Sequence, residues 1–157
     1  MTRRPARPEP RYGTAAVEFA VTALFLVPLI IGLWEVGRMV QVQQLLANAA
    51  REGGRQASTG NVDTAGVQSV VASYLTRNGI TCASSNVTVT NLTSSSRNDP
   101  KTANQFDQFQ VTVSIPFNSV RWVLLNQITN VTQLSASANW VSMKDVPITV
   151  NQNIPLN

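Results

Sequence analysis

The sequence has no histidine, one cysteine and few charged residues. Asp, Glu, Lys and Arg together make up only 13% of its 157 residues. The lack of histidine excludes imidazole acid–base catalysis and imidazole metal ligands, and Cys82 alone cannot form an intrachain disulfide or a thiolate metal cage. We also find no glycine-rich phosphate loop, paired-carboxylate site or nucleophile–base set. The sequence therefore predicts no cofactor, no metal site and no enzymatic activity.

Positive charge is concentrated at the amino end. The formal net charge is +4, but residues 1–12 contain four arginines and one glutamate, while the other 145 residues contain eight basic and seven acidic side chains. This excess is a short tail and not a basic surface that could follow a phosphate backbone, so we expect no nucleic-acid partner. Three prolines in the same segment disfavour a helix or strand, and residues 1–13 are interpreted as a basic leader peptide.

The segment that follows is long and apolar. Residues 14–34 contain a single charge, Glu18, and as a helix they would extend about 30 Å, the thickness of a bilayer's hydrocarbon core. The arginines in front of the segment place the amino terminus in the cytoplasm by the positive-inside rule. A secretory signal cleaved near Ala49 would require a site about a dozen residues too far downstream, and a buried core helix would lack apolar cover. We therefore predict a single-pass protein of the inner (cytoplasmic) membrane whose carboxyl-terminal domain is extracytoplasmic.

Glu18 is the unusual residue of this segment, and two interpretations are open. It lies about 6 Å into a helix that begins at Thr14, so it can be an interfacial carboxylate that pairs with Arg11. Alternatively, cleavage after Gly13 would give Thr14 a free ammonium group, and Glu18 would be the fifth residue of the mature chain. These two charges could pair within one subunit or between axially offset subunits, and pairing between subunits would select a register for helix stacking.

Residues 11–57 resemble a known family. Gly13–Ala20, Pro28-Leu29, Gly32–Arg38 and Ala49–Arg55 are similar to the pattern of TadE-like proteins, minor pseudopilins of the tight-adherence (Tad/Flp, type IVb) pilus system. The resemblance implies cleavage by a prepilin peptidase after Gly13, followed by recruitment of the mature subunit to a pilus assembly platform through Glu18. It also implies contacts with other pilin or pseudopilin subunits, and possible release from the membrane into an extracellular pilus.

Three residues of this region depart from what the resemblance leads us to expect. Phe19 stands where major pilins of this system have tyrosine, and Thr14 replaces the large apolar first residue of type IVa pilins. Gly53-Gly54 replaces alanines that are usual in the family. Each glycine is expected to weaken a helix by about 1 kcal/mol relative to alanine.

The helical pattern continues past the membrane and predicts one transmembrane and extended assembly helix over residues 14–57. We expect Pro28 to kink the span or to free a carbonyl near Leu24. Helix-packing or membrane-exit contacts are predicted at five positions, namely Pro28, Gly32, Glu35, Gly37 and Arg38. Glu35 with Arg38, and Glu52 with Arg55, have the i,i+3 spacing of surface ion pairs. The outer half of the helix needs cover, which the carboxyl-terminal domain can supply.

The remaining chain predicts an extracytoplasmic α+β domain over residues 58–146. An amphipathic helix begins at Asp63 or Thr64, buries a face that includes Val67, Val71 and Leu75, and ends at Gly79 with a left-handed residue. Alternation predicts three antiparallel strands. We further expect Cys82 to be buried or inert, and Trp122 and Trp140 to lie in the core. The elements expected in this region are strands 87–92, 109–115 and 134–143, a mobile polar loop 93–105, a short helix 119–126 and an irregular tail 147–157.

The fold expected from these elements is α+β and pilin-like. It comprises a long amino-terminal transmembrane helix, a second amphipathic helix and a small antiparallel sheet of about three strands. The first functional hypothesis is a non-enzymatic minor pseudopilin that is processed after Gly13. The second is an unprocessed single-pass anchor whose outer domain binds a surface or an envelope partner. A third, an exported enzyme cut near Ala49, lacks a candidate active site.

Overall fold

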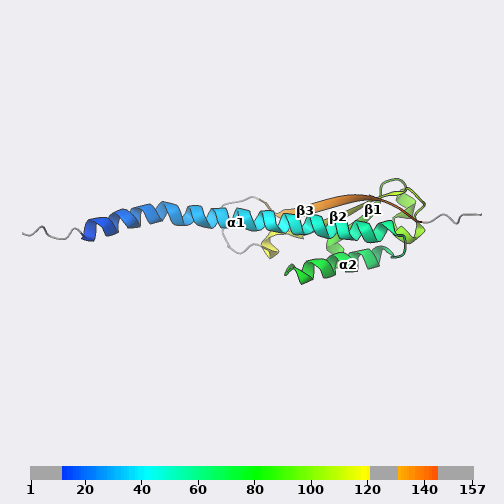
Figure 1. Ribbon diagram of the computed structural model, residues 1–157, viewed down its shortest axis with the longest axis horizontal. Coiled ribbons are helices and arrows are strands. Elements are labelled where there is room, and N and C mark those ends of the chain that lie inside the picture. Colours follow the sequence, from blue (N-terminus) through cyan, green and yellow to red (C-terminus); the bar gives the residue numbers. More distant parts are fainter. Residues whose placement is uncertain (1–11, 121–130, 145–157) are drawn as a thin grey trace, which may run out of the picture.

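The computed structural model describes residues 12–120 and 131–144. Residues 1–11 of the expected leader, Trp122, most of the expected helix 119–126 and the tail from Pro147 lie outside these residues, whereas the last two leader residues, Tyr12 and Gly13, already belong to the first helix. One helix projects from a small α+β domain, and its second half forms part of that domain (Figure 1). This arrangement confirms the expected fold class, with a long helix, a second helix and a three-stranded antiparallel sheet.

Helix α1 runs from Tyr12 to Ser58 and continues through Pro28. Its first half is exposed, whereas five small or apolar residues of its second half are fully buried: Val42, Leu46, Ala49, Ala50 and Ala57. These positions recur at intervals of three, four and seven, so they lie on one face of the helix. The cover that the outer half requires is therefore supplied by the chain itself, because this face packs against α2 and the sheet.

Helix α2 extends from Thr64 to Arg77 and has both of the expected ends. The Asp63 carboxylate accepts a hydrogen bond of 2.8 Å from the Gly66 backbone N–H, which caps the first turn. At the other end Gly79 has a φ of +75°, and the Ile80 N–H donates to the Leu75 carbonyl at 2.9 Å. Gly79 thus ends the helix in the left-handed conformation that its sequence position predicts.

The sheet has the order β1-β2-β3 and is antiparallel throughout. Its strands are β1 (Val87–Asn91), β2 (Gln108–Pro116) and β3 (Gln133–Val141). Four side chains of β2, at alternate positions, are fully buried against the helices: Phe109, Val111, Val113 and Ile115. Short 3₁₀ turns flank the strands at η1 (Ser84–Asn86), η2 (Ser95–Arg97), η3 (Pro100–Thr102) and η4 (Phe117–Ser119).

Two strands end earlier than the alternation predicts. β1 stops at Asn91, and β3 stops at Val141 and not at Met143. At the end of β3 the chain turns toward the helices, because the Met143 N–H donates to the Ser58 carbonyl at the end of α1. A tertiary hydrogen bond therefore sets this boundary, and the local pattern does not show it.

The glycine pair of α1 is required by packing, which the sequence analysis did not anticipate. A Cβ atom on Gly53 would lie 2.5 Å from Val71 Cγ2 and 3.1 Å from Val111 Cγ1, and one on Gly54 would overlap the Trp140 ring. Carbon atoms in contact are normally about 3.5–4.0 Å apart. The two glycines therefore allow α2 and the sheet to approach α1 closely, and their low helix propensity is offset by this contact.

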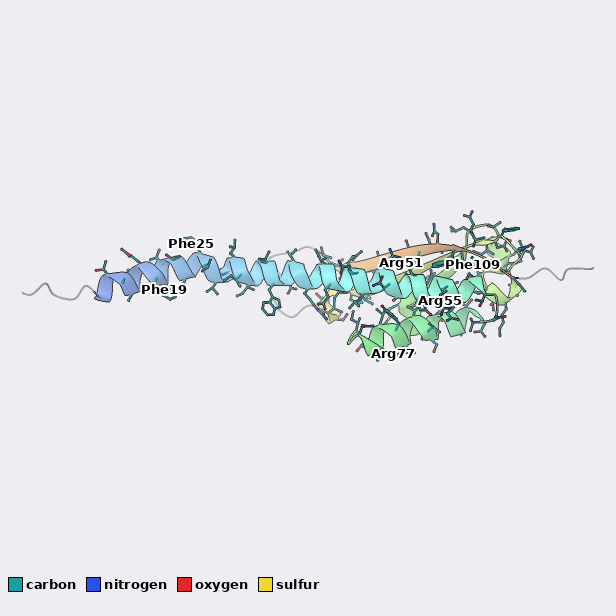
Figure 2. The ribbon with its side chains drawn as sticks, viewed as in Figure 1. Phe19, Phe25, Arg51, Arg55, Arg77 and Phe109 are labelled. Atoms are coloured by element: carbon teal, nitrogen blue, oxygen red, sulfur yellow. The ribbon has the colours of Figure 1, made fainter. Side chains whose placement is uncertain are left out.

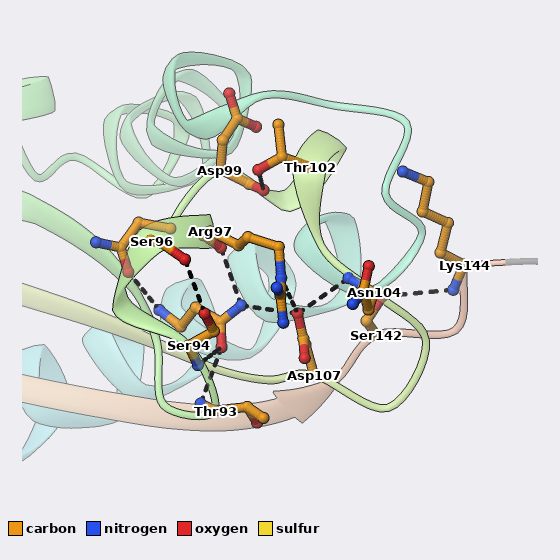
Figure 3. Close-up of polar contacts among 12 residues, drawn as sticks. Thr93, Ser94, Ser96, Arg97, Asp99, Thr102, Asn104, Asp107, Ser142 and Lys144 are labelled. Atoms are coloured by element: carbon orange, nitrogen blue, oxygen red, sulfur yellow. Dashed lines mark hydrogen bonds and ion pairs between the residues drawn. The ribbon is translucent and has the colours of Figure 1, made fainter.

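The polar segment between β1 and β2 is organised around Asp107 (Figure 3). This residue is 3% exposed, and its Oδ2 accepts hydrogen bonds from the Asn104 backbone N–H (2.9 Å), Asn91 Nδ2 (3.1 Å) and Arg97 Nε (3.3 Å). The hydrogen bond from Asn104, assisted by those from Asn91 and Arg97, lowers the pKa of Asp107. The segment expected to be a polar loop is thus a series of turns joined to one buried carboxylate.

Candidate functional site

The most distinctive surface of the molecule is the first half of α1. Within Gly13–Ser58 it provides a stretch long and apolar enough to cross a membrane, and none of that stretch is buried in the protein. Large apolar side chains such as Phe19 and Phe25 project from the helix in different directions (Figure 2) and are about three-quarters exposed. Exposed apolar surface of this extent is unfavourable in water. Such a helix is suited to anchoring the chain in a membrane.

The residues predicted for processing and register lie at the start of this helix. Gly13 and Thr14 are exposed in the first turn of α1, and a Cβ atom on Gly13 would meet nothing within 4 Å. Glu18 is exposed one turn further along, and its backbone carbonyl accepts a 2.9 Å hydrogen bond from the Thr22 hydroxyl. Arg11, the alternative partner of Glu18, lies outside the described residues.

The five predicted packing positions do not form one surface. At 3.6 residues per turn, Pro28, Gly32 and Glu35 lie on the face that continues into the buried side of α1, whereas Gly37 lies on the opposite face. Neither Gly32 nor Gly37 is required by packing within the subunit, because a Cβ atom at either position would meet nothing within 4 Å. In this respect they differ from Gly53 and Gly54, which contact the outer domain.

Glu35 and Arg38 mark the place where α1 enters the folded domain. Glu35 is 5% exposed, and its Oε2 atom has no hydrogen-bond partner among the residues that the structure describes. Arg38 donates from Nε to the Val120 carbonyl at 3.1 Å and from a terminal nitrogen to Gln41 Oε1 at 3.0 Å. The expected i,i+3 pairing of Arg38 with Glu35 is therefore replaced by contacts that tie α1 to the chain after η4, because a backbone carbonyl of the folded domain is within reach.

The second expected ion pair is present. Arg55 contacts the Glu52 carboxylate through two hydrogen bonds of 2.6 and 2.9 Å, on an exposed part of α1. Solvent screens an exposed pair of this kind, so it contributes little to stability. It marks the solvent-facing side of α1, opposite to the side that packs on the sheet.

Cys82 is buried, as the sequence predicts, and lies in the core between α2 and η1. Burial raises the pKa of its thiol, which disfavours the reactive thiolate form. Across residues 12–120 and 131–144, no three Cys, Asp or Glu side chains lie close enough together to hold a metal ion.

The comparison with known families agrees with the resemblance of the amino-terminal region. Residues 13–55 match the model of the family described as TadE-like protein. The match begins at Gly13, covers α1 as far as Arg55, and includes Glu18 and all five predicted packing positions. It does not extend into α2 or the sheet. No curated protein and no solved structure shows significant similarity to the chain.

Proposed function

We propose that this chain is a membrane-inserted minor pseudopilin that contributes to assembly of a tight-adherence (Flp, type IVb) pilus and catalyses no reaction. The TadE-like match over residues 13–55 supports an association with the Tad pilus system. The observation that carries the proposal is the exposed apolar half of α1, which begins at the Gly13–Thr14 pair and has Glu18 as its one acidic residue before Glu35.

The continuity of α1 gives this helix a mechanical role. The same helix forms the apolar segment and, from Val42 onward, the core of the outer domain. Gly53 and Gly54 bring that domain into close contact, and Arg38 adds a hydrogen bond to the Val120 carbonyl. A force on the outer domain is therefore transmitted to the apolar segment. A subunit built in this way can be drawn from lipid into a bundle of similar helices, which would cover the same side chains.

Glu18 supplies the register of such a bundle in this proposal. A prepilin peptidase would cleave after the exposed Gly13 on the cytoplasmic side, and Thr14 would gain an ammonium group. An unpaired carboxylate is penalised in a medium of low dielectric constant, so the Glu18 carboxylate would favour the stacking position in which it meets the Thr14 ammonium of a neighbouring subunit. The attraction depends on cleavage, which ties assembly to processing.

Gly32 and Gly37 provide places where other helices can approach. Small residues allow the backbones of membrane helices to come close and to pack by van der Waals contact. The open space around both glycines within the subunit leaves that contact available to a neighbour. Glu35 and Arg38 would then lie at the outer edge of the same helix bundle, close to where lipid ends.

The proposal is tested by the amino terminus of the chain and by one matched pair of variants. Mass spectrometry of the protein from pili or membranes is expected to show a mature chain that starts at Thr14. Glu18→Ala should insert in the membrane normally but be absent from assemblies, whereas Thr22→Ala, one turn further on, should be incorporated like the wild type. An intact leader would instead support an unprocessed anchor that binds an envelope partner, and equal incorporation of both variants would refute the role of Glu18.

A further inference from the structure

The two edges of the sheet differ in how far the chain itself has closed them. In β1 the outward backbone groups belong to Val87, Val89 and Asn91, because the Leu92 N–H donates to the Gln108 carbonyl and bonds alternate along the strand. Gln68 Nε2 donates a hydrogen bond of 2.9 Å to the Val87 carbonyl, and the Asn91 N–H donates one of 2.9 Å to Asn98 Oδ1. Side chains of the same chain therefore close both ends of this short edge.

The edge formed by β3 is open along its middle. The Ser142 N–H donates to the Asp107 carbonyl, so the odd-numbered residues of β3 direct their backbone groups away from β2. Gln43 Nε2 binds the Ser135 carbonyl at 2.8 Å, and α1 ends against Met143. Between these points, the outward backbone groups of Ser137, Asn139 and Val141 have no hydrogen-bond partner within the described part of the chain.

β3 also lacks the features that usually prevent an edge from pairing. Its nine residues include no proline and no charged side chain, and its register with β2 is continuous without a bulge. Ala136, Ala138 and Trp140 point toward the helices but stay partly exposed, so the core is incompletely covered beside this edge. A hollow of ≈ 430 Å³ lies at the outer end of the strand and is lined by residues that include Trp140, Val141 and Met143.

One segment of the chain itself matches this edge in length, pattern and charge. The seven residues Ile148–Ile154 contain no charge and no proline and lie outside the described residues. In an extended strand, Ile148, Val150 and Ile154 would share one side with a single polar residue, Gln152, while the polar residues Thr149, Asn151 and Asn153 would occupy the other. The apolar side is suited to cover the partly exposed alanines, and the polar side would continue the exposed surface of Ser137 and Asn139.

We propose that Ile148–Ile154 of a second copy of this chain adds as a fourth strand to the open edge of β3. The same chain's own segment is disfavoured by the way β3 ends. The Met143 N–H is held by the Ser58 carbonyl, and Lys144 Nζ donates to the Lys101 carbonyl at 2.5 Å. The end of α1 therefore lies beside β3 where a hairpin return would begin, and the same chain's segment would have to pass it to reach Val141.

A contact of this kind extends from copy to copy. The donating segment and the accepting edge are different surfaces, so the interface is head-to-tail and leaves an unused edge at one end and an unused segment at the other. Main-chain hydrogen bonds supply the affinity, and the alternate apolar side chains supply the specificity. The proposal goes beyond the pilus role because it requires neither cleavage after Gly13 nor pairing by Glu18.

Disulfide trapping in membranes of cells that express the full chain tests this contact. In a Cys82→Ala background, Asn139→Cys is combined in turn with Thr149→Cys, Asn151→Cys or Asn153→Cys. At least one combination should form a covalent dimer on oxidation, because opposed residues of paired strands are within disulfide distance. Thr88→Cys, exposed on the closed edge of β1, is the control and should give no dimer with the same partners.

Two further variants test the face of the segment. Each variant is combined with Asn139→Cys and with whichever of Asn151→Cys and Asn153→Cys traps the dimer. Val150→Lys should abolish the dimer, whereas Thr149→Lys, a change of the adjacent residue on the polar side, should retain it. Bonds formed only within one chain, dimers formed by Asn139→Cys alone, or equal trapping at Thr88→Cys would each overturn the proposal. The same trapping in a Gly13 variant that resists cleavage would show the contact even if the pilus role fails.

Discussion

Replacing Gly54 with alanine tests whether close packing or helix propensity governs the middle of α1. Propensity alone predicts that alanine stabilises the helix by about 1 kcal/mol. The structure predicts the opposite sign, because the new Cβ would overlap Cγ, Cδ1 and Nε1 of Trp140. Cγ is attached directly to the Trp140 Cβ, so the whole ring must move, and overpacking of this kind costs about 1–3 kcal/mol.

The expected balance is a loss of up to about 2 kcal/mol in the free energy of unfolding of the outer domain, because the overpacking cost exceeds the propensity gain when the whole ring must move. The full chain in detergent micelles is titrated with urea at constant temperature and followed by far-UV circular dichroism. The midpoint should shift to lower urea while the slope of the transition is unchanged.

The decisive comparison repeats the change without the ring. In a Trp140→Ala background, Gly54→Ala should stabilise the outer domain by up to about 1 kcal/mol, because only helix propensity then distinguishes the two residues. The reversal of sign between the two backgrounds is the prediction. A Gly54→Ala effect that is stabilising with Trp140 present, or equally destabilising without it, would refute the packing explanation.

Three other outcomes follow from the same contacts. Folding lowers the pKa of Asp107, so the ionised carboxylate stabilises the folded state fully at pH values above its unfolded pKa, near 3.8, and this stabilisation is lost as the pH falls through the folded pKa. Asp107→Asn should therefore lower the free energy of unfolding at pH 7. It should also reduce the loss of stability between pH 5 and pH 2, measured in acid titrations followed by circular dichroism. Asp63→Ala should lower the free energy of unfolding by about 1 kcal/mol by removing the cap of α2, and an unchanged urea midpoint would contradict this role. Gly32→Leu should fold like the wild type, since its surroundings are open, but should reduce incorporation into pili; normal incorporation in a pull-down of assembled subunits would argue against a helix contact at this position.

Local chemistry was sufficient to predict the elements of the fold and the place of the membrane helix. The apolar stretch after Gly13, the cap at Asp63, the left-handed residue at Gly79 and the alternation in the strands each reflect interactions within a few residues. Such interactions are encoded by neighbours in the sequence, so the pattern can be read without tertiary information. The roles of Gly13 and Thr14 in processing, and of Glu18 in register, stay predictions, because nothing in a single subunit tests them.

The sequence by itself determined which segments form helices and strands, because periodic burial and end signals are local properties of the chain. Only the tertiary structure decided what meets across long separations: Gly54 under Trp140, Arg38 at the Val120 carbonyl, and Asp107 beside Asn91. The physical reason is that such contacts depend on how helices and sheet approach one another in space. The surfaces that pack beside a residue decide whether a glycine in a helix is required, and they decide whether a strand edge has hydrogen-bond partners.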